Sequence, residues 1–348
     1  MYLTKIKLTN FRNITNKELS FGKATVLLAD NTRGKTNILE AIFYLSTGRS
    51  FRAEKESEVI RADAQFADIE GMIVSKEEKT KLRVFISNEN ETKKKMMQVN
   101  GVNRNLSNFS GHLKVIIFTP ENFDILYGSP TIRRRYLDSI LVQVDRKYAR
   151  SLSQYKKVTY QRNRLLERIR ERKAQVNELD YWNRKLIELG RLIQETRYQL
   201  ISFLDVQLNN YSFLHRKQKR ISLIYESNLV NEERLIRYQP REIEAGVTLI
   251  GPHRDDLGVN LEGKKIITFG SRGEQRLAIL SLSLTALEFV EHMVNKRPLL
   301  LLDDIFSELD AYHRSSVLEV VKKQQTIITT TDWEFKTTDI DDLKIINL

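Results

Sequence analysis

Four consecutive leucines followed by two aspartates, Leu299–Asp304, constrain the fold of this chain more than any other segment. An uninterrupted apolar run of this kind is typical of a strand buried on both faces of a parallel sheet. Asp303 and Asp304 stand at the carboxyl end of that strand. A strand end that turns into solvent also favours aspartate, so the pair alone is weak evidence for a site. The buried run before it favours an α/β fold with a functional site at the strand end.

A phosphate-binding loop is predicted where the chain reads Ala-Asp-Asn-Thr-Arg-Gly-Lys-Thr-Asn between a predicted strand and a predicted helix. The backbone N–H groups of such a loop and the N-terminus of the following helix attract phosphate. Lys35 supplies a charge to the β- and γ-phosphates of ATP, and the Thr36 hydroxyl is placed to ligate Mg²⁺. The predicted ATP-binding residues are Ala29, Asp30, Asn31, Thr32, Arg33, Gly34, Lys35, Thr36 and Asn37.

The first position of this loop departs from the usual pattern, because Ala29 stands where a glycine is common. If the backbone there needs a positive φ, alanine costs about 1–2 kcal/mol. We therefore expect a somewhat weakened hold on the nucleotide.

The two aspartates have separate predicted roles. Asp303 and Thr36 are predicted Mg²⁺ ligands, and Asp304 is the predicted catalytic residue, which orients or polarises the attacking water. Phosphoryl transfer needs little covalent help from the protein, so positioning and charge neutralisation carry most of the effect. The segment Ser307–Asp310 follows at once and is a candidate border of a dimer interface.

A third motif, Ser271-Arg272-Gly273-Glu274-Gln275, comes about 30 residues before the acidic strand and opens an apolar helix. Ser271 is placed to donate to a γ-phosphate oxygen, Gly273 allows a close backbone approach, and the helix dipole favours an anion. The alternative is a helix cap in which Ser271 and Glu274 satisfy each other's backbone N–H groups. The two interpretations are compatible.

The composition limits the possible functions. The chain has 348 residues, a formal net charge of +12 and no cysteine, which excludes a disulfide framework and a thiolate metal site. An HExxH pattern and an apolar run of about 18 residues are also absent from the sequence, so we expect neither a zinc hydrolase nor a membrane partner. The basic excess favours a nucleic acid or another polyanion as partner.

The organisation along the chain suggests an α/β lobe split by an insertion. Residues 1–120 and 240–348 are predicted to form the α/β lobe, and residues 121–239 a helical insertion lobe. Apolar side chains at three- and four-residue steps predict at least two long antiparallel helices between residues 131 and 208, with a break near Lys173–Asn177.

Taken together the motifs resemble the RecF family, in the superfamily of ABC-type and SMC-type ATPase heads. The resemblance runs nearly from end to end, and the segment Gly251–Asp256 is absent from general ABC or SMC heads. The other matching segments are Leu8–Asn13, Gly34–Ala41, Gly48–Arg52, Pro120–Asn122, Arg133–Asp138, Tyr155 with Gln161–Asn163, and Leu302–Asp310.

The resemblance implies an ABC-type ATPase head with a phosphate loop, ATP and Mg²⁺ as cofactors, and weak DNA-stimulated ATPase activity. It implies an ATP-dependent homodimer that binds double- and single-stranded DNA and gap junctions. It further implies a cytoplasmic, nucleoid-associated protein that acts with RecR and RecO type partners, and through them on RecA, in recombinational repair.

The resemblance also assigns roles to particular residues. Ser271, Gly273 and Glu274 match the signature motif that reaches the ATP of the other protomer, although Glu274 stands where ABC-type heads generally have glutamine. Gln143 is a candidate for the glutamine that senses Mg²⁺. The charge of Glu274 is expected to lie near the phosphate.

The candidate DNA contacts are basic runs, from which we select Arg133, Arg134, Arg135 and Arg162. Such runs are often solvated faces, and Arg133–Arg135 can instead brace the fold. The wider runs are Lys93–Lys95, Arg133–Arg135, Arg162–Arg172 and Arg216–Arg220.

Two other functions fit parts of the pattern. One is a different SMC- or ABC-like head ATPase of DNA metabolism, such as an overcoming-lysogenisation-like nuclease, which would need an additional carboxylate-rich domain. The other is a DNA-binding scaffold that does not hydrolyse ATP.

Overall fold

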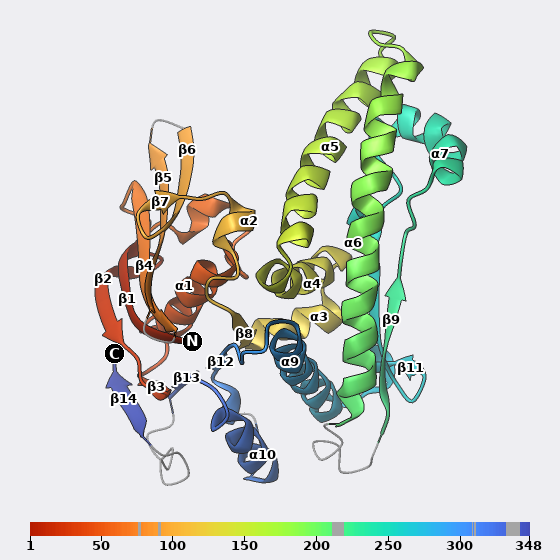
Figure 1. The fold of residues 1–348 in the computed structure, drawn as a ribbon. Helices are drawn as coiled ribbons and strands as arrows, with labels where there is room; N and C mark the ends of the chain where they lie inside the picture. Colours follow the sequence, from red (N-terminus) through yellow and green to blue (C-terminus); the bar gives the residue numbers. More distant parts are fainter. Residues whose placement is uncertain (76–77, 90–91, 211–218, 308, 310, 332–341) are drawn as a thin grey trace. The chain divides into compact units, whose positions relative to one another are not determined.

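The chain divides into two compact units in a computed structural model that describes residues 1–75, 78–89, 92–210, 219–307, 309, 311–331 and 342–348 (Figure 1). The sheet unit comprises Met1–Phe123, Asn210–Gln218 and Arg276–Leu348. The helical unit comprises Asp124–Asn209 and Lys219–Gln275. Each unit is described by itself.

A five-stranded parallel sheet lies at the centre of the sheet unit. Every residue of β3, β8, β12 and β13 is buried, as the leucine run predicts for a strand covered on both faces. In spatial order the strands are β14 (Leu343–Asn347), β3 (Ala24–Leu28), β13 (Thr326–Thr330), β12 (Leu299–Asp303) and β8 (Val115–Phe118).

A second, antiparallel sheet of six strands completes the layers of the sheet unit. Burial alternates along β4, so one face of this sheet packs against the core and the other faces outward. Asn100-Gly101 forms the hairpin turn between β6 and β7, with φ of 51° and 79°. In spatial order the strands are β2 (Ile14–Ser20), β1 (Tyr2–Phe11), β4 (Phe66–Ser75), β5 (Glu78–Glu89), β6 (Thr92–Val99) and β7 (Val102–Asn103).

Helix α1 (Lys35–Thr47) contacts strands of both sheets, which explains why it is buried on nearly all sides. Its apolar residues join those of the two sheets in one hydrophobic cluster. The sheet unit therefore fixes the start of α1 against the carboxyl ends of the parallel strands. Its remaining elements are η1 (Glu56–Val59), α2 (Leu106–Phe109), η2 (Pro120–Phe123), η6 (Ile305–Ser307) and α10 (Ala311–Val321).

Helix α9 (Arg272–Val294) begins in the helical unit and continues in the sheet unit. It contains an 18-residue window that is apolar enough to cross a membrane, but 67% of that window is buried inside the protein. Its apolar character is that of a core helix.

The helical unit is built on two long helices, α5 (Arg146–Arg170) and α6 (Leu179–Leu208), which pack against each other and run in opposite directions (Figure 1). The predicted apolar stripes are buried, and the predicted break falls between the helices. The other elements are α3 (Asp124–Tyr127), α4 (Pro130–Val144), η3 (Val176–Glu178), α7 (Glu232–Ala245), η5 (Pro252–Arg254), α8 (Ile266–Phe269), β9 (Ile221–Glu226), β10 (Asp256–Leu261) and β11 (Lys264–Lys265).

The division of the chain differs from the predicted boundary at residue 240, because residues 219–275 group with the helices. Strands β9, β10 and β11 form a separate antiparallel sheet, and β9 and β10 pack against α6 and α4. Strands therefore begin again at Ile221, whereas the sheet unit resumes only at Arg276.

Buried arginines connect this small sheet and α7 to the long helices. Arg197 of α6 donates to Asp138 at 2.8 Å and to Asp255 at 3.1 Å. Arg162 of α5 donates to Glu242 of α7 at 2.6 Å. A buried charge is tolerated only when it is paired and hydrogen-bonded, so these contacts require residues 240–255 to stay on the helices.

Candidate nucleotide-binding site

The predicted phosphate loop lies between β3 and α1, and its backbone turns through two left-handed residues, Thr32 at φ 69° and Gly34 at φ 90°. The positive φ favours glycine at position 34, and a Cβ atom there would lie 2.9 Å from Asn13 Oδ1 and displace that side chain. Asn13 Nδ2 donates to the Thr32 carbonyl at 3.0 Å, and Asn37 donates to Asn13 Oδ1 at 2.8 Å. Asn13, in the turn between β1 and β2, therefore supports the loop, and the sequence pattern did not predict this role.

Lys35 is buried at the start of α1, and its ammonium group donates to the carbonyls of Ala29 at 2.5 Å and Asp30 at 3.0 Å. Burial lowers the pKa of Lys35, and the charges of Asp304, Asp303 and Asp30 act in the opposite direction. The lysine thus lies inside the turn of the loop and within electrostatic reach of the predicted catalytic residue, Asp304, and of the predicted Mg²⁺ ligand, Asp303.

Ala29 causes no backbone strain, because its φ is not positive. Its N–H donates to the Thr330 carbonyl at 3.4 Å as β3 ends. The expected cost of 1–2 kcal/mol for alanine at this position therefore does not arise.

Asp303 and Thr36 are joined at the carboxyl end of β12. Thr36 Oγ1 donates to Asp303 Oδ2 at 2.7 Å, and Thr329 Oγ1 donates to Asp303 Oδ1 at 2.5 Å. Burial raises the pKa of Asp303, the hydrogen bonds from Thr329 and Thr36 lower it, and the charges of Glu121 and Asp304 raise it. A bound cation would offset the desolvation of this carboxylate.

The donor set fits Mg²⁺. One hydroxyl and one carboxylate beside a phosphate loop are the protein ligands that Mg²⁺ takes in phosphoryl-transfer sites, where phosphates and water complete the octahedron. Within the part of the chain that the structure describes, no group of three His, Cys, Asp or Glu side chains forms an all-protein metal site.

Asp304 has a left-handed backbone with φ 48°, directly after the end of β12. Its N–H donates to the Thr329 carbonyl at 3.1 Å and to Thr329 Oγ1 at 3.0 Å. A non-glycine residue in this region costs about 1–3 kcal/mol and persists where the surroundings fix it, most often at functional sites. Thr329 of the neighbouring strand thus holds the carboxylate of Asp303 and the backbone of Asp304.

Glu121 is a third carboxylate at this site, and the sequence analysis did not select it. It lies in η2 directly after β8, and its charge contributes to the raised pKa of Asp303. Glu121 Oε1 pairs with Arg52 Nε at 3.3 Å, and the buried Oε2 has no hydrogen-bond partner among the described residues. Glu121 reaches this site because β8 is the parallel neighbour of β12 and adjacent strand ends meet at one edge of the sheet.

Ser271 and Glu274 form the capping interaction that was kept open as an alternative. The Ser271 N–H donates to Glu274 Oε2 at 2.8 Å, and the Glu274 N–H donates to Ser271 Oγ at 3.3 Å. The Glu274 carboxylate also pairs with Lys219 at 2.6 Å, and this hydrogen bond is the main reason that its pKa is lowered to about 2. The additional negative charge of Glu274 is therefore balanced inside the helical unit.

Gly273 is exposed in the first turn of α9, and a Cβ atom there would meet nothing within 4 Å. Glycine lowers helix stability by roughly 0.5–1 kcal/mol relative to alanine. The packing of the described residues gives no reason for glycine at this position.

The remaining predicted site residues lie in the helical unit. Gln143 is buried in α4, where its amide donates to the Ser139 carbonyl at 2.6 Å, and its role as a Mg²⁺ sensor stays a prediction. Arg133 pairs with Asp256 at 2.6 Å, Arg134 donates to the Asp255 carbonyl, and Arg135 is exposed.

Arg162 requires a correction. It is fully buried and paired with Glu242, so it stabilises the fold and has no surface to offer to DNA. The predicted interface residues Glu308 and Asp310, and residues 216–218 of one basic run, lie outside the described residues.

Comparison with known proteins agrees with this geometry. The RecF/RecN/SMC N terminal domain family matches residues 2–343. The DNA replication and repair proteins RecF of Bacillus mycoides (strain KBAB4) and Oceanobacillus iheyensis are 36% and 35% identical to this chain, and each alignment covers 96% of it and 93% and 94% of the relatives.

A solved structure described as the recombination mediator protein RecF-ATP in the RecFOR pathway aligns with a TM-score of 0.88. It is 30% identical, and the alignment covers 96% of this chain and 93% of that chain. The predicted fold class, an ABC-type ATPase head of mixed α/β structure with a parallel sheet, is confirmed.

Proposed function

The chain belongs to the RecF family, and from this premise we propose that it is an ATP-dependent DNA-binding protein of recombinational repair. It binds ATP with Mg²⁺, closes into a homodimer, holds DNA while closed, and opens after slow hydrolysis. With RecR and RecO type partners it helps to load the recombinase, RecA, at single-strand gaps. This places it in the cytoplasm, on the nucleoid.

The observation that carries the proposal is the joint placement of Lys35, Thr36 and Asp303 at one sheet edge. The lysine charge and the loop N–H groups bind the phosphates, and Mg²⁺ neutralises the charge that develops on them. Asp303, held by two threonine hydroxyls, keeps its carboxylate oriented toward the Thr36 side of the loop.

Asp304 supports the hydrolytic part of the proposal. Its backbone is fixed by Thr329, and its charge reaches Lys35. Aspartate is one methylene shorter than the glutamate that can serve at such a position, so the attacking water is held less closely and turnover is slow.

Gly273 supports the dimeric part. An exposed glycine at the N-terminus of a long helix, beside a serine hydroxyl, suits the γ-phosphate of an ATP bound to a second copy of the chain. ATP then serves as the link between protomers, and its hydrolysis removes that link.

Sedimentation of the purified protein with ATP, with ADP and without nucleotide tests the proposal most directly. We expect a dimer with ATP only, together with ATP hydrolysis that DNA increases. A monomer under all three conditions would exclude the ATP-dependent dimer. Absence of hydrolysis with intact ATP-dependent DNA binding would instead identify a scaffold.

A further inference from the structure

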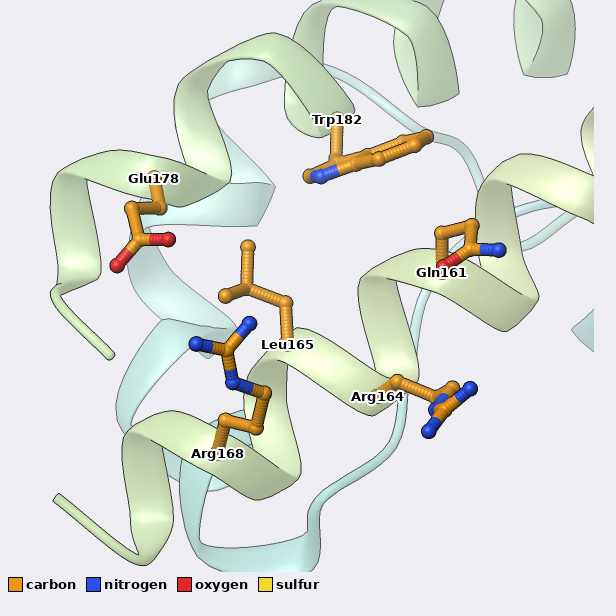
Figure 2. Close-up of a pocket in the computed structure, with 6 residues that line it drawn as sticks. All are labelled: Gln161, Arg164, Leu165, Arg168, Glu178 and Trp182. Atoms are coloured by element: carbon orange, nitrogen blue, oxygen red, sulfur yellow. The ribbon is translucent and has the colours of Figure 1, made fainter. Parts of the chain in front are cut away.

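The helical unit contains a pocket of about 350 Å³ (Figure 2). None of the individually selected site residues lines it, but two of its residues, Arg164 and Arg168, belong to the basic run Arg162–Arg172. It lies near the C-terminal end of α5 and the N-terminal end of α6, and residues of both helices and of η3 form its wall. The lining residues are Gln161, Arg164, Leu165, Arg168, Glu178 and Trp182.

The pocket combines an apolar floor with an aromatic wall. Leu165 lies at its centre in Figure 2, with the Trp182 ring above it. Trp182 packs on the buried cluster that includes Leu165, Leu166 and Leu179, and it is only partly buried. The Trp182 ring is therefore held in place by packing while part of its surface remains open to the pocket.

Two arginines supply positive charge at the same place. Arg164 and Arg168 lie one helical turn apart on α5, so their side chains project from one face. Arg164 lies 5.9 Å from the Tyr160 ring, and Arg168 donates to the Lys173 carbonyl at 3.3 Å. Neither is paired with a carboxylate among the residues that the structure describes, so both charges are available to an anion.

Hydrogen-bonding groups complete the pocket. Glu178 and Arg164 stand at opposite ends of it in Figure 2. Glu178 accepts from the Gln175 N–H with one oxygen, at 2.7 Å, which fixes the carboxylate at the rim. Gln161 offers an amide from the α5 side.

We propose that this pocket binds a nucleotide of single-stranded DNA, with the base against Trp182 and Leu165 and the flanking phosphates on Arg164 and Arg168. Aromatic rings beside arginines are the usual platform for unpaired bases, whose faces stack and whose backbone follows the charge. Tyr160 and Tyr181, which are 58% and 55% exposed, flank the pocket residues in sequence and offer further stacking surfaces.

The polar rim decides between a base and the alternative occupant, an acidic peptide with an apolar anchor. An apolar side chain would leave Gln161 and Glu178 without a hydrogen-bonding partner on the ligand. A base has an edge that bonds to both groups, and the cytosine amino group donates to a carboxylate. The inference rests on the proposed function only in taking DNA as the ligand.

Trp182 provides its own readout. The sequence has two tryptophans, so the full-length Trp333→Phe variant reports Trp182 fluorescence alone. We expect a deoxycytidylate hexamer to quench this fluorescence without ATP, because all pocket residues belong to the helical unit. In that background Arg164→Ala/Arg168→Ala should weaken binding and reduce the salt slope by about 1.4, the value for two phosphate contacts on a single strand.

The matched control is Arg184→Ala/Arg191→Ala, which removes two exposed arginines of α6 that do not line the pocket. It should leave the quenching and its salt slope as they are. Trp182→Leu keeps an apolar side chain on the cluster and should weaken binding of a labelled hexamer about tenfold. Circular dichroism verifies that this variant is folded.

Failure of this inference can be distinguished from failure of the proposed function. If the hexamer does not quench Trp182 fluorescence while ATP-dependent duplex binding is intact, the proposed role of the pocket is wrong and the proposed function stands. Quenching by an acidic peptide that contains phenylalanine, and not by the hexamer, overturns it in favour of a protein partner. Equal losses of hexamer affinity in the pocket variant and the control variant would overturn the inference, because they would show that binding depends only on the overall positive charge.

Discussion

Thr36 and Asp303 lie 267 positions apart in the sequence, and a hydrogen bond of 2.7 Å joins Thr36 Oγ1 to Asp303 Oδ2. This contact couples the phosphate loop at the start of α1 to the carboxyl end of β12. It brings together the hydroxyl and the carboxylate that are proposed to ligate Mg²⁺.

Asp304→Asn should retain ATP binding and lose turnover by at least about 100-fold, because an amide cannot polarise the attacking water as a carboxylate does. Asparagine also tolerates the left-handed backbone at this position, so the fold should be unaffected. Steady-state hydrolysis and sedimentation with ATP measure the two effects, and an accumulated dimer is expected. Hydrolysis at the original rate would remove Asp304 from the mechanism.

Lys35→Met should abolish ATP binding itself, because it removes the buried charge nearest to the phosphates while keeping a side chain of similar length. Equilibrium binding of a fluorescent ATP analogue measures the loss. Lys79→Met, at an exposed position of β5, is the control with the same change of charge. Equal affinities of the two variants for nucleotide would contradict the assignment.

Gly273→Ala should separate stability from assembly. Within the monomer the new methyl group meets nothing, so the variant should gain roughly 0.5–1 kcal/mol of helix stability. At the partner's ATP the same methyl group blocks a close approach, so ATP-dependent dimerisation should weaken. Thermal unfolding and light scattering with ATP are the measurements, and a more stable variant that still dimerises fully would show that the position faces solvent.

Arg162→Ala should destabilise the helical unit by about 3–5 kcal/mol, because it leaves Glu242 buried without its partner. Arg162→Met/Glu242→Leu should recover part of this loss, since it removes both charges and fills similar space, while the Leu249 N–H loses its acceptor. Urea unfolding followed by circular dichroism measures both. A stable Arg162→Ala protein that loses only DNA affinity would restore Arg162 as a DNA contact.

Duplex DNA should bind largely without sequence preference, and its affinity should fall steeply with salt, because the net charge of +12 acts on phosphates. ATP should tighten binding, since closing a dimer brings two basic surfaces onto one duplex. Titrating a labelled duplex at several salt concentrations, with ATP and with ADP, tests both expectations. A flat salt dependence would reject the electrostatic account, and equal affinity with both nucleotides would reject the gating.

Local signals predicted the strands, the phosphate loop and the two long helices, because each depends on residues close together in the chain. Leu299–Asp303 and Lys35–Thr47 appear where the apolar run and the loop placed them. Asn13 and Glu121 were missed as site residues because their roles arise from contacts between separate segments of the chain, which a single sequence does not record.

The boundary at residue 240 was misplaced for a related reason. Segments that carry the family resemblance, Arg133–Asp138, Gln161–Asn163 and Gly251–Asp256, meet in one buried polar network of the helical unit. Strand-like patterning cannot reveal which unit a strand joins, whereas paired buried charges decide it.

The left-handed backbone of Asp304 limits which carboxylate can stand at this position, and therefore bears on the proposed slow rate of ATP hydrolysis. Asparagine and aspartate are strongly enriched at positive φ among residues other than glycine, and glutamate is not. A longer carboxylate that could hold the water more closely would have to adopt a φ of about 48°, against its own preference. If Asp304 orients the attacking water as proposed, the turn after β12 limits how long the carboxylate at this position can be, and faster hydrolysis would require a different turn.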